Sequence, residues 1–130
     1  MLNKRKFLLL FSLWMLLITY LSLYRIPEEQ ESNFWFDNLD KLVHLGIYLV
    51  TTVIGYFAFQ ESFKNKFSKA KAIRVVFVLA VAYGLLIELL QHLMPYNRMA
   101  ELMDVIANTV GALLGCWLIQ KYSSLIPSTN

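Results

Sequence analysis

Several side chains of the kinds used in catalysis lie within or beside apolar stretches of the sequence. His44 could transfer protons near neutral pH, because an unperturbed imidazole titrates in that range. Glu88 could act as a general acid, since a carboxyl group shielded from water suits that task. Arg98 could bind a phosphoryl group through two parallel hydrogen bonds, with Lys41 as a second cation. Asp104 could orient His44, act as a base or hold a divalent cation. These residue types predict acid–base chemistry on a phosphoester.

Three uncharged polar residues, Tyr48, Gln91 and Asn108, could contact the substrate of such a site. Taken singly, each is explained more simply by hydrogen bonding between helices, a common role of polar residues in membranes. Asp40 and Glu101 could be solvated acids or helix caps.

The spacing of these residues indicates that they converge. Residues three or four apart share one face of a helix, and three separate stretches follow this spacing. The three stripes are Lys41, His44, Tyr48, Thr52 and Gly55; then Gly84, Glu88, Gln91 and His92; then Asp104, Asn108, Gly111 and Gly115. In each stripe the ionisable members lie toward the same end. We therefore expect three helices to enclose one polar pocket, with Gly111 and Gly115 allowing close approach of a neighbouring helix.

The elements that must position this pocket are membrane-spanning helices. The chain has 130 residues, of which 58% are hydrophobic, a proportion too high for an ordinary soluble domain. A spanning helix needs about 20 mostly apolar residues, and four stretches meet this requirement. We expect an all-α, polytopic four-helix bundle, a single domain over residues 1–130, with helices over 7–24, 42–59, 73–94 and 100–119.

The distribution of basic residues predicts the orientation of the bundle. One end holds nine Lys and Arg residues, namely Lys4, Arg5, Lys6, Lys64, Lys66, Lys69, Lys71, Arg74 and Lys121. The opposite end holds Arg25, Lys41 and Arg98. Because basic residues in short loops favour the cytoplasmic side, both termini should be cytoplasmic and the polar pocket should face outside. The aromatic triplet Phe34, Trp35 and Phe36 suits a short segment at the outer interface.

Several alternatives are set aside on the sequence. The first span follows a basic segment, as a signal peptide does, but its apolar run is long and a clean cleavage site is missing, which favours a retained anchor. The basic 60–72 loop is better suited to anionic lipid headgroups than to nucleic acid. The single Cys116 excludes a disulfide framework. A divalent metal is not favoured, because the candidate ligands His44, Glu88, His92 and Asp104 follow no metal-binding motif.

Two blocks of the sequence, "DKLVHLGIY" and "ELLQHLMPYNRMAELMDVIANTVGALLG", resemble the VanZ-like family of small bacterial membrane proteins. The matching positions are Asp40, Lys41, His44, Tyr48, Glu88, Gln91, Arg98, Asp104, Asn108, Gly111 and Gly115. Asn97 departs from the pattern, since many members have glycine there. The resemblance implies a multi-pass protein of the bacterial cytoplasmic membrane, in a family whose namesake is associated with low-level resistance to the glycopeptide teicoplanin.

Two functions remain open from the sequence. The first is an enzyme that hydrolyses or exchanges the headgroup of a membrane lipid, or of a lipid-linked cell-wall precursor, at the outer leaflet. The second is a module that binds or shields a lipid or amphiphile without chemistry. A proton-coupled carrier is less consistent, because the inner halves of the spans are almost entirely apolar. Membrane lipids are the expected partners, and nucleic acid is not.

Overall fold

The computed structural model describes residues 5–24, 34–94 and 102–125, and for residues 34–37 the backbone alone. All regular structure in these residues is helical: α1 (Lys6–Leu23), α2 (Phe34–Ser62), α3 (Lys69–Leu93), α4 (Leu102–Tyr122) and the short 3-10 turn η2 (Ser123–Leu125). Each of the four α-helices is long and apolar enough to cross a membrane, so the prediction of an all-α bundle with four spans is confirmed.

Two helices begin earlier in the chain than the apolar runs do. α2 begins at Phe34 and not at residue 42, so the aromatic triplet is the first turn of a spanning helix and not a separate segment. α3 begins at Lys69 and not at residue 73, because the Ser68 hydroxyl caps the helix by accepting a bond from the Lys71 amide at 3.3 Å. Hydropathy locates the apolar part of a helix and omits the polar turns that continue it.

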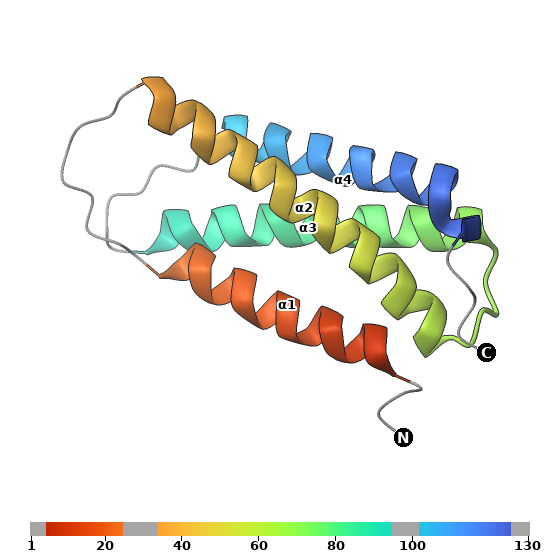
Figure 1. Cartoon of the computed structure of the whole chain (residues 1–130). Helices are drawn as coiled ribbons and strands as arrows, with labels where there is room; N and C mark the ends of the chain where they lie inside the picture. Colours follow the sequence, from red (N-terminus) through yellow and green to blue (C-terminus); the bar gives the residue numbers. More distant parts are fainter. Residues whose placement is uncertain (1–4, 25–33, 95–101, 126–130) are drawn as a thin grey trace.

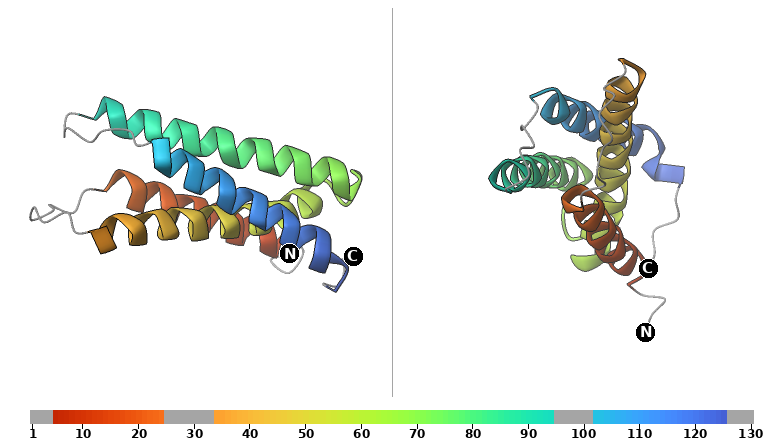
Figure 2. Two further views of the ribbon diagram at one scale, coloured as in Figure 1. Left: turned by 90° about the horizontal axis from the view of Figure 1, so that it is seen from above. Right: turned by 90° about the vertical axis from the view of Figure 1, so that its left-hand side faces the viewer.

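The four helices form a bundle in which α2 and α4 run in the same direction, and α1 and α3 run in the opposite one (Figure 1). The most extensive contact joins α2 to α4, and α2 also packs against α1 and α3 (Figure 2). We call the end where α2 and α4 begin the site end, and the end that holds the start of α1 and residues 62–69 the basic end. The site end therefore collects the first turns of two parallel helices.

Small residues set the close packing of α4 on α2. A Cβ atom on Gly111 would lie 2.2 Å from the Leu45 carbonyl oxygen, and one on Gly115 would lie 2.9 Å from Cβ of Thr52. Ala112 and Thr52 have no exposed surface. The helix backbones can approach this closely only because no side chain separates them, as expected for small residues between membrane helices.

α1 is attached to the bundle by polar contacts as well as by ring contacts such as the stacking of Phe7 on Phe57. Ile18 is its one buried side chain among the described residues. The Trp14 indole donates to the Thr51 hydroxyl at 2.9 Å, and the hydroxyls of Thr19 and Tyr83 are hydrogen-bonded at 2.7 Å. These two bonds join α1 to α2 and to α3.

The outward faces of all four helices are apolar. Leu16 of α1, Leu42 of α2, Val78 of α3 and Trp117 of α4 are each more than half exposed. A soluble protein rarely exposes such contiguous apolar surface, whereas a bilayer solvates it. Towards the basic end, Tyr56, Ala72, Ile73 and Ile119 form a buried apolar cluster that joins α2, α3 and α4. The chain is a multi-pass membrane protein.

Candidate functional site

The candidate site lies where α2 and α4 face each other at the site end. Asp40, Lys41 and His44 project from the early part of α2, and their spacing places them on neighbouring positions of one helix face. Asp104 and Asn108 are one turn apart on α4, in its first two turns. Both α4 residues are buried. The N-terminal end of a helix favours negative charge, which contributes to stabilising the Asp104 carboxylate.

Lys41 and Asp104 form the central ion pair of this site. The Lys41 ammonium contacts Oδ1 of Asp104 and lies 3.5 Å from Oδ2 of Asp40. The Asp104 side chain is only 6% exposed, while that of Lys41 is 23% exposed. A carboxylate with so little access to water requires a close cation or donors, because an isolated buried charge is costly. Lys41 meets that requirement and keeps partial access to the surface.

His44 lies between the two helices, with one ring nitrogen hydrogen-bonded to α4 and the other near two carboxylates. Nδ1 lies 3.0 Å from Oδ1 of Asn108, so Nδ1–H donates to the amide oxygen. Nε2 lies 3.7 Å from Oδ1 of Asp40 and 4.0 Å from Oδ2 of Asp104. The bond to Asn108 fixes the tautomer and the ring orientation. Nε2 is then the nitrogen that faces the carboxylates of Asp40 and Asp104.

Tyr48 lies one turn deeper in the bundle than His44, and Glu88 is a buried acid on α3, which packs against α2. Glu88 is 5% exposed on α3, and Tyr48 is 5% exposed on α2. Tyr48 is one turn further along α2 than His44, and a Cβ atom on Gly84 would lie 3.1 Å from its ring. Gly84 thus lets the Tyr48 ring lie against α3. Tyr48 thus continues the polar stripe of α2 inward, while Glu88 lies one turn nearer the site end than Gly84.

The Gln91 side chain contacts α1. Its amide nitrogen donates to the backbone oxygen of Ser22 at 2.8 Å, so Gln91 joins α3 to the end of α1. A role in substrate binding stays a prediction. His92, the neighbouring candidate metal ligand, is exposed. Arg98 and Glu101 lie outside the described residues.

Replacing Gln91 with leucine should loosen α1 without altering the polar cluster. We expect the free energy of unfolding to fall by about 1 kcal/mol, the typical net contribution of one hydrogen bond. Any activity of the His44 site should change little. Thermal unfolding of the purified variant in detergent, compared with the exposed neighbour variant His92→Leu, measures the effect. A loss of activity in a variant with unchanged stability would instead support the predicted contact with substrate.

Asp40 belongs to the polar cluster, although the sequence suggested that it is a solvated acid or a helix cap. Its spacing of four residues from His44 was the available signal. One ligand atom from each of Asp40, His44 and Asp104 lies within 4.8 Å of the others, a separation that a metal ion could bridge. Lys41 contacts both carboxylates, however, so a cation at this position would compete with the ammonium group. Glu88 and His92, two of the ligands suggested by the sequence, are not part of this group.

Comparison with known proteins adds one finding. The family model described as VanZ/LLP1 matches residues 4–123, which include all four α-helices in full. No curated protein and no solved structure matches the chain. The matched range contains every residue of the polar cluster.

Proposed function

The chain belongs to the VanZ/LLP1 family, and we propose that its polar cluster acts on the phosphoester headgroup of a membrane lipid or of a lipid-linked cell-wall precursor. The observation that carries this proposal is the convergence of His44, Lys41, Asp104 and Asn108 at the end of two spanning helices. A site at this depth meets lipid headgroups, which lie just beyond the ends of the apolar spans. Ionisable groups within membrane helices mark functional sites by default, because they are costly to maintain there.

The proposed reaction uses His44 as the proton acceptor. Nε2 takes a proton from a water molecule or an alcohol while its oxygen attacks phosphorus, and the bond between phosphorus and the leaving oxygen breaks. The leaving oxygen receives a proton from Glu88 or from the imidazolium. Water as the attacking group gives hydrolysis, whereas a second alcohol gives headgroup exchange. Asn108 keeps Nδ1 occupied, so Nε2 is the nitrogen that reacts.

Charge on the phosphoryl oxygens would be met by Lys41, with Arg98 as a second cation from outside the described residues. Lys41 is paired with Asp104 in the structure, so the incoming phosphate has to compete with that carboxylate. Partial exposure of the Lys41 side chain favours such an exchange of partners. Arg98 suits the second role because a guanidinium binds two phosphate oxygens at once.

The proposal is tested by turnover of labelled lipids. The purified protein, reconstituted in nanodiscs, is incubated with labelled phospholipids and with undecaprenyl-linked precursors, with EDTA or with added Mg²⁺ or Zn²⁺. Release or exchange of one headgroup, abolished in the His44→Gln variant, supports the proposal. If no lipid is turned over under any of these conditions, the enzymatic function is wrong.

A binding module is the second candidate, and the Lys41–Asp104 pair favours it. A cation that is already neutralised by a buried carboxylate contributes little to catalysis. It can still recognise a ligand, because only an anion can replace the carboxylate as the partner of the ammonium group, and this makes binding selective for anions. In the same nanodiscs, saturable binding of one lipid without turnover, weakened by Lys41→Met, would identify this function.

The polar cluster is proposed to face the outside of the cytoplasmic membrane, with both termini in the cytoplasm. In a Cys116→Ser background, a cysteine at the exposed position Leu39 near the site end should react with an impermeant maleimide added to intact cells. A cysteine at the exposed position Lys66 at the basic end should react only after the membrane is permeabilised. The reverse pattern would place the cluster on the cytoplasmic side.

A further inference from the structure

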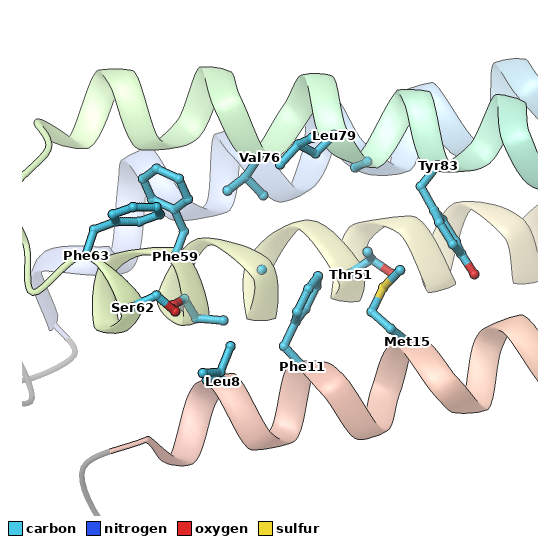
Figure 3. A pocket seen from close by; sticks show the side chains of 13 residues that line it. Leu8, Phe11, Met15, Thr51, Phe59, Ser62, Phe63, Val76, Leu79 and Tyr83 are labelled. Carbon is cyan, nitrogen blue, oxygen red and sulfur yellow. The ribbon is translucent and has the colours of Figure 1, made fainter.

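A second feature, separate from the polar cluster, is a groove between α1 and α3 with α2 as its floor (Figure 3). Its volume is about 320 Å³. Phe11 and Met15 of α1 form one wall, and Val76 and Leu79 of α3 form the other. The surfaces are almost wholly apolar, and the volume lies at the small end of the range of about 300–1,000 Å³ for ligand sites. Such a space suits a single unbranched hydrocarbon chain.

Gly55 leaves space between the two walls of the groove, because it has no side chain. A Cβ atom on this residue would lie 3.2 Å from both the Phe11 ring and the Val76 side chain, so any larger residue would fill the space between the two walls. Toward the site end, the Thr19–Tyr83 bond joins the walls, and the Trp14–Thr51 bond joins α1 to the floor. These two bonds close the groove on the side of the polar cluster.

The groove opens sideways, to the surface that faces the bilayer. Leu79 on its rim is 60% exposed, and Phe63 at the basic end of the groove is 44% exposed. A hydrocarbon chain can therefore enter from the membrane without passing the polar cluster. Its headgroup would lie at the basic end, because the bonds described above close the other end.

The charges around the basic end match an anionic headgroup. Leu8 and Phe63 are the groove residues at the basic end. In the chain, exposed cations come just before Leu8, just after Phe63 and just before Val76, which also lines the groove. They are Arg5, Lys6, Lys64, Lys66, Lys71 and Arg74. The nearest acid, Glu61, accepts a bond from the Leu8 amide at 2.8 Å and so serves the first turn of α1. Lysine and arginine at a membrane surface attract anionic lipids by electrostatics.

We propose that this groove holds an acyl chain of an anionic phospholipid from the leaflet at the basic end of the bundle. The apolar contacts alone do not select this lipid over its neighbours, because lipid tails are as apolar as the groove. Selection comes from the headgroup charge and from the fit of one chain between α1 and α3. The bound chain fills the space that the α1–α3 contacts leave open, and it supports a helix with few buried side chains of its own.

The test uses the full chain in nanodiscs containing phosphatidylglycerol or phosphatidylcholine with the same diazirine-labelled acyl chain. After illumination, peptide mass spectrometry locates the cross-links. We expect labelling at Phe11 and Met15 to exceed that on the exposed α4 face at Leu113 and Leu114. We also expect phosphatidylglycerol to label the groove about fivefold more than phosphatidylcholine. This is the ratio expected when the anionic headgroup is attracted by one nearby lysine or arginine.

Two neighbouring positions provide a matched pair of variants. Leu79 lines the groove and Val78 does not, and their exposed fractions are nearly equal, at 60% and 61%. Leu79→Trp should fill the groove and reduce the cross-links at Phe11 and Met15 to the level of the α4 face, while Val78→Trp should leave them unchanged. Lys6→Gln with Lys66→Gln should reduce the preference for phosphatidylglycerol. Equal labelling of the groove and the α4 face, or equal loss in both tryptophan variants, would identify ordinary surface lipid and overturn the proposal. Equal labelling of the groove by the two lipids would show that the bound lipid is not selected for an anionic headgroup.

Discussion

Replacing Gly111 with alanine is expected to lower the free energy of unfolding by about 3 kcal/mol, the upper part of the range for overpacked cores. The added methyl carbon would lie 2.2 Å from the Leu45 carbonyl oxygen, 2.9 Å from the carbonyl carbon and 3.0 Å from the α-carbon. All three are backbone atoms of α2, so no side-chain rotation can relieve the contact. The two helices must separate, and His44 then moves away from Asn108. Thermal unfolding in detergent, followed by circular dichroism, measures the loss.

Gly46 provides the control for this substitution. It is also a helical glycine on α2, but a Cβ atom there would have no atom within 4 Å. Gly46→Ala should therefore be neutral, or stabilise the helix by about 0.5–1 kcal/mol because alanine has the higher helix propensity. Equal destabilisation by Gly46→Ala and Gly111→Ala would show that the close contact of α4 with α2 is not what Gly111 provides.

The second large effect is expected on activity. His44→Gln should reduce the rate of headgroup turnover by about 10²–10⁴-fold, the usual contribution of a general base. Glutamine keeps a polar side chain that can hydrogen-bond to Asn108, so folding should be retained while proton transfer is lost. The rate is measured with the labelled lipid identified in the turnover assay. His92→Gln is the matched control, because His92 lies near the same end of the bundle and is exposed.

Asn108 should act on the rate through His44. Its amide oxygen accepts from Nδ1 at 3.0 Å, and Asn108→Asp preserves an acceptor at that position. We expect Asn108→Asp to retain activity with a shifted pH profile, because a carboxylate favours the charged imidazole. Asn108→Leu should lower kcat, since Nδ1 loses the acceptor that fixes the ring. If both variants had the same activity and the same pH profile, Asn108 would serve packing alone.

The sequence was sufficient to predict the number of helices and the faces that meet. Apolar runs of spanning length predicted four helices, and the spacing of Lys41 and His44 on one helix and Asp104 and Asn108 on another predicted that these side chains converge. Helical periodicity determines which residues share a face, and glycines indicate which faces can approach closely. These are local properties that can be read from one chain.

The partners of individual side chains could not be predicted in the same way. Asp40 reaches Lys41 and His44 because α2 extends through it as regular helix, and hydropathy does not mark that polar turn. Gln91 shares the stripe of Glu88, yet its amide donates to the Ser22 backbone oxygen of α1. A carbonyl group leaves no signal in the sequence, and the side to which a long side chain turns depends on the neighbouring helix. The role of Thr19 was missed for the same reason, since its partner Tyr83 lies on another helix.

The parallel pairing of α2 with α4 has a consequence for how the protein is made. The two helices are separated in the chain by α3, and α4 is synthesised after the other three. During translation, a chain that has inserted its first three helices already contains His44 and Lys41, but neither Asp104 nor Asn108 has been made. A message truncated before codon 104 therefore yields an embedded protein without a site. The site is assembled only after α4 has entered the bilayer.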